Sequence, residues 1–89
     1  MPKWWPKIVE AKLGWTGNGK SRLYIFGDQE PGRIRIHRRL RGLIRLDTLI
    51  HELLHEFNPK WTERRVKRTA TRLAKILWSQ GYRRVDYGF

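Results

Sequence analysis

The stretch LIRLDTLIHELLHEF, residues 43–57, decides the fold that this sequence predicts. Its apolar residues recur every three or four positions, which is the spacing of one face of an α-helix. Asn58-Pro59 ends the predicted helix, because the residue before a proline avoids helical backbone angles. A second helix is predicted over about residues 63–80, with Thr62 as its N-cap and Gly81 as its stop. The second half of the chain is therefore helical.

The first half of the chain predicts short strands instead. Charged and apolar residues alternate in Arg33–His37, as they do in a half-buried or edge strand. We expect an α+β fold in a single domain, residues 1–89, with a small antiparallel sheet of about three strands followed by the two helices. The predicted strands are Lys7–Leu13, Leu23–Phe26 and Arg33–His37, and the predicted turns are Trp15–Lys20 and Asp28–Gly32.

Composition and charge narrow the class of protein. The chain has 89 residues, of which 39% are hydrophobic, and it has no cysteine, which excludes disulfides and thiolate metal sites. The net charge of +12 predicts attraction to polyanions such as nucleic acid, but an arginine-rich solubilising surface explains it equally well. Scarce glutamine, asparagine and methionine weakly favour a heat-adapted source. Neither a long apolar run nor a signal peptide is recognisable, so we expect a cytoplasmic protein without a membrane span.

Two histidines, His51 and His55, lie one helical turn apart with Glu52 beside them. Residues at this spacing share a helix face, so both imidazoles can reach one metal ion. On a helical projection both histidines turn away from the apolar arc, which centres near Leu53 and Phe57. A solvated face is the alternative, but arginine or lysine would be the commoner occupant in this chain. We therefore predict that both histidines bind zinc and that Glu52 deprotonates a zinc-bound water molecule.

A catalytic zinc site needs a third protein ligand, and four residues are candidates. Glu63 is favoured, because the turn between the helices returns the start of the second helix beside the end of the first; complementing the helix dipole is its alternative role. Glu56 points elsewhere on the first helix. Asp47 shares the stripe of histidines but lies a turn too early, so a supporting or helix-dipole role fits it better. His37 ends the last strand and could approach from above.

One face of the second helix is strongly basic. As a functional surface it could lie along a phosphate backbone, and as an ordinary surface it would simply be solvated. Charge spacing does not separate the two readings. The residues are Arg64, Arg65, Lys67, Arg68, Arg72 and Lys75.

The motif His51–His55 and its surroundings resemble the active-site region of compact zincin metallopeptidases of the minigluzincin or SprT-like type, including small phage-encoded ones. The resemblance covers roughly residues 33–83: an alternating strand, a short link, the motif helix, a proline-containing turn and a second helix. It implies a minimal zincin-like fold and a zinc endopeptidase with Glu52 as general base. Glu63 would match the glutamate that gluzincins take from a later helix. The histidine extension of metzincins is missing, and no histidine follows His55.

The expected reaction is zinc-dependent hydrolysis of peptide bonds in a protein or peptide substrate. The substrate would bind extended at a sheet edge, for which Arg33–His37 is favoured. Tyr82, Tyr87 or His37 would steady the oxyanion. The alternative function is a basic nucleic-acid-binding module with a structural metal or none, whose aromatic residues stack on bases. The two functions would combine in a protease that acts on DNA-bound proteins, and a zincin fold serving only as a binding scaffold is a third possibility.

Overall fold

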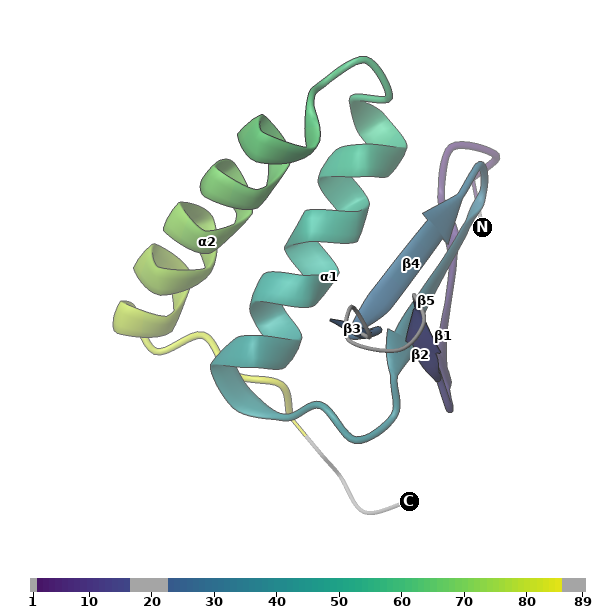
Figure 1. Ribbon diagram of the computed structural model, residues 1–89. Helices are drawn as coiled ribbons and strands as arrows, with labels where there is room; N and C mark the ends of the chain where they lie inside the picture. Colours follow the sequence, from purple (N-terminus) through teal and green to yellow (C-terminus); the bar gives the residue numbers. More distant parts are fainter. Residues whose placement is uncertain (1, 17–22, 86–89) are drawn as a thin grey trace.

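Two helices lie side by side next to a small sheet in the computed structural model, which describes residues 2–16 and 23–85 (Figure 1). Helix α1 spans Gly42–Phe57 and helix α2 spans Glu63–Ser79, so both predicted helices are confirmed. The predicted caps are confirmed as well. Thr62 accepts a hydrogen bond from the Arg65 backbone N–H at 3.2 Å, and Asn58 is the C-cap of α1.

Helix α2 ends in a left-handed turn at Gly81, whose φ is +90°. The backbone N–H of Gly81 donates to the Trp78 carbonyl at 3.0 Å, and that of Tyr82 donates to the Leu77 carbonyl at 3.1 Å. This pair of bonds is the Schellman arrangement, which satisfies carbonyls that would otherwise lack donors at the helix end. It fixes the direction in which the chain leaves α2.

The sheet has three strands in the order β1-β5-β4, where β1 is Lys7–Ala11, β4 is Gly27–Glu30 and β5 is Arg33–His37. Strand β5 pairs antiparallel with β4 and parallel with β1, so the sheet is mixed. The α+β fold class and the strand number are confirmed, and one of the two pairings is parallel where only antiparallel pairing was expected. A parallel partner is possible because a long stretch of chain separates β1 from β5.

Three details of the predicted sheet are wrong. Leu23–Phe26 was expected to be one of its three strands, but Leu23–Tyr24 belongs to a separate sheet. Asp28–Gly32 was expected to be a turn, but most of it is strand β4, and the turn is confined to Pro31-Gly32. Polar residues are compatible with a strand here because β4 is an edge strand. The favoured substrate-binding edge, β5, is instead the central strand.

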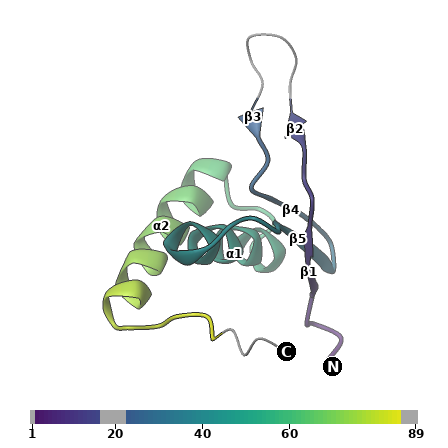
Figure 2. The same ribbon diagram turned by 90° about the horizontal axis from the view of Figure 1, so that it is seen from below.

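A second, two-stranded sheet is formed by β2, Trp15–Thr16, and β3, Leu23–Tyr24. It replaces the start of the predicted turn Trp15–Lys20, the rest of which lies outside the described residues. Figure 2 shows these strands extending away from the helices. They carry the chain from β1 around to β4.

Helix α1 is the middle layer, since it contacts α2 on one side and both β4 and β5 on the other. The core lies at these two interfaces. On α2, the large apolar residues Leu73 and Ile76 do not occupy the helix interface, since they are 40% and 59% exposed. Small residues take that place, because they allow the two helices to approach closely. Among the described residues, the buried apolar side chains include Leu13, Ile34, Ile36, Val66, Ala70 and Ala74.

The position of α1 also changes which of its residues are buried. Phe57, at the centre of the predicted apolar arc, is 52% exposed, whereas Thr48 and Glu52 are buried. Helix α1 is covered on two sides, so part of its polar stripe is enclosed as well. Glu56 fastens the end of α1 to the β4–β5 turn, where it accepts hydrogen bonds from Gln29 Nε2 at 2.6 Å and the Gly32 N–H at 2.9 Å. Within the described residues, no helix is long and apolar enough to cross a bilayer.

Candidate metal centre

Three side chains from the two helices converge where the chain turns from α1 to α2. The four-residue spacing puts His51 and His55 on one face of α1, and the turn brings Glu63, the first residue of α2, opposite them. The two carboxylate oxygens of Glu63 lie 2.8 Å from His51 Nε2 and 2.7 Å from His55 Nε2. The sequence predicted this set of three, and the structure brings them together.

The geometry of the three residues suits a metal ion. The two imidazole Nε2 atoms are 3.2 Å apart, and one ligand atom from each of the three residues lies within 4.8 Å of the others. Two nitrogens bound tetrahedrally to zinc at about 2.05 Å would be about 3.3 Å apart. The side chain of Glu63 is 67% exposed, and those of His51 and His55 are about one-fifth exposed. The group is therefore open to solvent on one side, where a further ligand has room.

Glu52 lies next to this group and is almost entirely buried, with 7% of its surface exposed. Its Oε1 is 3.9 Å from His51 Nε2. Burial raises the pKa of the Glu52 carboxyl to about 7, and repulsion from the carboxylates of Glu63 and Asp28 adds to the increase. A carboxyl with this pKa exchanges protons readily near neutral pH.

A cleft of about 670 Å³ opens beside the three residues, between α1, α2 and the start of β4. Its size falls within the range of about 300–1,000 Å³ that is usual for ligand sites. Acidic and apolar side chains share its wall with one lysine. The lining residues are Ile25, Phe26, Gly27, Ile44, Asp47, Thr48, His51, Glu52, Glu63, Lys67 and Thr71.

Gly27 allows β4 to come this close to α1. A Cβ atom at Gly27 would lie 2.8 Å from Thr48 Cγ2, 3.0 Å from the Arg35 carbonyl oxygen and 3.4 Å from Glu52 Cγ. The first of these distances is too short for any side chain to be accommodated without movement. The absence of a side chain at Gly27 thus lets the start of β4 lie against Thr48 and Glu52 of α1.

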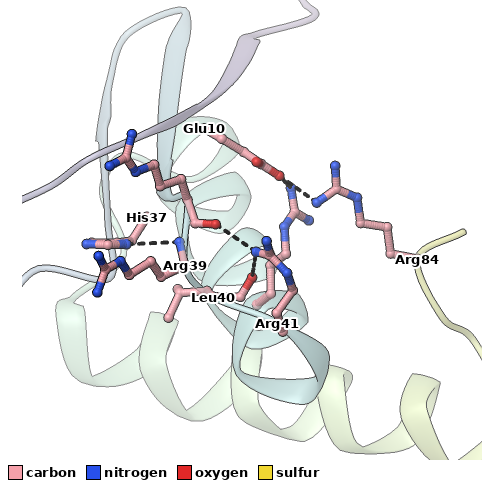
Figure 3. Close-up of polar contacts among 8 residues, drawn as sticks. Glu10, His37, Arg39, Leu40, Arg41 and Arg84 are labelled. Atoms are coloured by element: carbon pink, nitrogen blue, oxygen red, sulfur yellow. Dashed lines mark hydrogen bonds and ion pairs between the residues drawn. The ribbon is translucent and has the colours of Figure 1, made fainter. Parts of the chain in front are cut away.

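Asp47, His37 and Tyr82 do not join the three converging residues. Asp47 lines the cleft and accepts a hydrogen bond from Thr71 Oγ1 at 2.9 Å, so it links α1 to α2. His37 is 3% exposed, and its Nδ1 accepts a hydrogen bond from the Arg39 N–H at 3.1 Å (Figure 3). Tyr82 follows the far end of α2, about 25 Å from Glu63 by the helical rise.

Tyr82 is therefore wrong as an oxyanion residue for this cleft, and the ring of His37 is turned into the β5–α1 link. Tyr87 lies outside the described residues. The basic residues predicted on α2 are all exposed, and Arg65 lies over the ring of Trp61 at 4.0 Å. Lys67 also lines the cleft. Polyanion binding by this face stays a prediction.

Sequence reasoning missed Gly27, Thr48 and Thr71 as cleft residues. Thr48 lies one turn before Glu52, and its hydroxyl donates to the Ile44 carbonyl at 2.8 Å, which leaves its methyl group facing Gly27. Position on the helix stripe was the available signal for Thr48. Nothing in the local sequence indicated that Gly27 begins a strand.

Comparison with protein-family models, with curated proteins and with solved structures found no match to this chain. The resemblance to compact zincins therefore rests on residues 51–55 and on the order of the elements. The converging side chains of His51, His55 and Glu63 are a separate, structural observation.

Proposed function

We propose that the protein is a zinc-dependent peptidase whose site comprises His51, His55, Glu63 and Glu52. The observation that carries the proposal is the convergence of two imidazole nitrogens and one carboxylate beside a buried glutamate, in a cleft large enough for a substrate. Two histidines and one glutamate are a common ligand set of catalytic zinc, which leaves one position open.

In this proposal each side chain has one task. A zinc ion held by the three residues would lower the pKa of a water molecule and polarise the scissile carbonyl. The Glu52 carboxylate accepts the proton of the attacking water and then donates it to the amine that leaves. Its raised pKa supports both steps, since a base near neutrality can also act as an acid.

Strand β4 is the edge at which we expect an extended substrate to bind. It forms one end of the sheet order, and Gly27 at its start lines the cleft. An edge strand offers backbone N–H and carbonyl groups to an added strand. This assignment replaces β5, which is central.

The decisive test compares Glu52→Gln with the matched exchange Glu56→Gln one turn later on α1. Both purified proteins are assayed for zinc content and for cleavage of fluorescently labelled, unfolded casein. Glu52→Gln should keep its zinc and lose at least about 100-fold in cleavage rate, because the proton acceptor is gone. Glu56→Gln should cleave casein at the rate of the unaltered protein.

Two results would contradict the proposal. Unchanged cleavage by Glu52→Gln would remove Glu52 from the reaction. The second result is a protein that folds without metal and has the same Tm with and without added zinc. It would show that His51, His55 and Glu63 form a hydrogen-bonded cluster instead.

A further inference from the structure

A second cavity, of about 530 Å³, lies at the opposite end of the helical pair, between the start of α1, the end of α2 and strand β1. It shares no lining residue with the cleft beside Glu63. Apolar and basic side chains both line it. The lining residues are Glu10, Arg41, Gly42, Arg45, Leu46, Leu49, Trp78, Tyr82, Arg83 and Arg84.

Positive charge is in excess around this cavity. Four of the lining residues are arginines, and Glu10 is the one acidic residue among them. Arg45 Nη2 and Arg84 Nη1 both donate to Glu10 Oε1, at 3.1 and 2.5 Å (Figure 3). One carboxylate thus faces two guanidinium groups. A bound anion would lower the remaining repulsion between them.

The arginines also keep donors available for a ligand. Arg41 uses Nη1 for the carbonyls of Arg38 and Leu40, at 2.7 and 2.8 Å. Arg83 uses Nη1 for the carbonyls of Trp78 and Tyr82, at 2.7 and 2.9 Å. A guanidinium carries five N–H donors, so contacts through a single nitrogen orient the group without exhausting it. Such oriented groups are suited to phosphate.

Two aromatic side chains, Trp78 and Tyr82, line the cavity together with the arginines. The guanidinium of Arg83 lies 3.4 Å from the centre of the Trp78 ring, and Tyr82 is 65% exposed. The Schellman turn at Gly81 fixes Tyr82 relative to Trp78. An exposed aromatic ring held next to arginines is the arrangement that stacks a nucleic-acid base while its phosphate is neutralised.

We propose that this cavity binds single-stranded nucleic acid, with a base against the exposed ring of Tyr82 and the neighbouring phosphates among the four arginines. An acidic peptide would satisfy the charges, but it would leave the exposed ring without a flat partner. A free nucleotide carries the same chemistry on a smaller scale. This inference goes beyond peptide hydrolysis and does not depend on it.

The first experiment tests stacking with two substitutions of one residue. Binding of fluorescein-labelled oligothymidylate of ten nucleotides is measured by fluorescence anisotropy at several salt concentrations. Tyr82→Ala should weaken binding by about tenfold, whereas Tyr82→Phe, which keeps the ring, should change it by less than about twofold. Since Tyr82 is exposed, both variants should fold, which circular dichroism checks. Equal affinity of the Ala and Phe variants would overturn the proposal.

The second experiment tests whether the charges act at this place. Arg45→Gln with Arg84→Gln is compared with Lys3→Gln and Lys60→Gln, which remove the same charge at the other end of the molecule. The cavity pair should lose at least about tenfold in affinity and lower the salt slope by about 1.4, the value for two phosphate contacts on a single strand. The control pair should lose less than about threefold. Equal losses would show that only overall charge matters.

Two further probes test whether the ligand is instead a free nucleotide or an acidic peptide. Thymidine monophosphate should compete only at far higher concentration than the oligonucleotide, and competition at equal concentration would assign the cavity to a free nucleotide instead. A labelled peptide of ten glutamates should bind more weakly and be insensitive to Tyr82→Ala. Binding of that peptide as tight as that of the oligonucleotide would overturn the proposal in favour of an acidic protein partner.

Glu52→Gln should bind the oligonucleotide with the affinity of the unaltered protein. A failure of the proposed peptide hydrolysis can therefore be distinguished from a failure of nucleic-acid binding.

Discussion

The two cavities at the ends of the α1–α2 pair differ in the charge of their linings. At the end where α2 begins, Asp47, Glu52 and Glu63 all line the cleft, which is three of the eight acidic residues in the chain. At the end where α2 finishes, four arginines and one acidic residue, Glu10, line the cavity. The net charge of +12 is therefore unevenly distributed between the two cavities, so each cavity attracts a different kind of ligand.

The difference between the ends also concerns burial. Glu52 is buried, and its pKa is raised mainly by that burial and further by the carboxylates of Glu63 and Asp28. Glu10 lies in a more open place, and its pKa is lowered, mainly by its hydrogen bond to Arg84. The same residue type therefore favours proton exchange at one end and a permanent charge at the other.

The largest expected effect is the increase in thermal stability on binding zinc, for which only the acidic cleft offers ligands among the described residues. Zinc at about 100 times its dissociation constant stabilises the folded state by about 2.7 kcal/mol. For a domain of this size that corresponds to a rise of about 10–20 °C in Tm over the protein in chelator. His55→Ala should abolish this rise, as measured by differential scanning calorimetry.

His37→Ala is the matched control for that experiment, since His37 lies outside the converging group. It should lower Tm with and without zinc and leave the difference between them intact. An equal loss of the zinc effect in both histidine variants would break the assignment of the metal to His51, His55 and Glu63.

The next largest effect is expected for Gly27→Ala, which would disturb the acidic cleft without changing the proposed metal ligands. The added methyl group would lie 2.8 Å from Thr48 Cγ2, so the free energy of unfolding should fall by about 2 kcal/mol. Gly14→Ala is its control, because an added Cβ there meets nothing within 4 Å, and it should change stability by less than about 0.5 kcal/mol. Urea denaturation measures both. Equal stability of the two variants would show that β4 can move away from α1 freely.

A smaller effect is expected at the basic end from Gly81→Ala. The φ of +90° strains any residue with a side chain, so unfolding should become easier by about 1 kcal/mol. Gly81→Asn should cost less, since asparagine tolerates this region better. Oligonucleotide binding by Gly81→Ala should weaken too, because Tyr82 would no longer be held. If stability and oligonucleotide binding both stayed unaltered, the turn at Gly81 would have no role in holding the cavity.

The smallest effect on stability should come from Glu10→Gln, which sharpens the contrast by removing the acidic residue that lines the basic cavity. Its surface ion pairs contribute about 0.2–1 kcal/mol, so Tm should hardly change. Oligonucleotide affinity should rise by about two- to threefold, because a repelling charge is gone. Glu30→Gln, which loses the exposed pair with Arg33 at 3.4 Å, should leave affinity unchanged. Weaker binding by Glu10→Gln would contradict the proposed cavity.

The helices and their junction could be predicted from the sequence because the signals are local. Apolar spacing, Thr62 as N-cap and Gly81 as stop each act within one helical turn, and all three are found in the structure. The place of Glu63 followed from the short turn at Asn58–Trp61. Helical geometry thus sufficed to bring the three candidate ligands together.

The sheet could not be predicted as well, because strand partners are chosen by distant parts of the chain. Gly27–Glu30 is polar and was expected to be a turn, yet pairing with β5 makes it a strand. The separation of Tyr82 from Glu63, in contrast, could have been predicted, because the helix predicted over residues 63–80 already lies between them. Zinc binding, peptide hydrolysis and nucleic-acid binding stay predictions.

The parallel pairing of β1 with β5 has a consequence for the order of folding. Its partners, such as Lys7 and Arg33, are far apart in sequence, whereas β4 and β5 adjoin through a tight turn and α1 and α2 through a short one. Contacts between distant residues cost more chain entropy to form. During synthesis, β1 must also wait until β5 has left the ribosome. The strand that is made first is therefore among the last to find its partner.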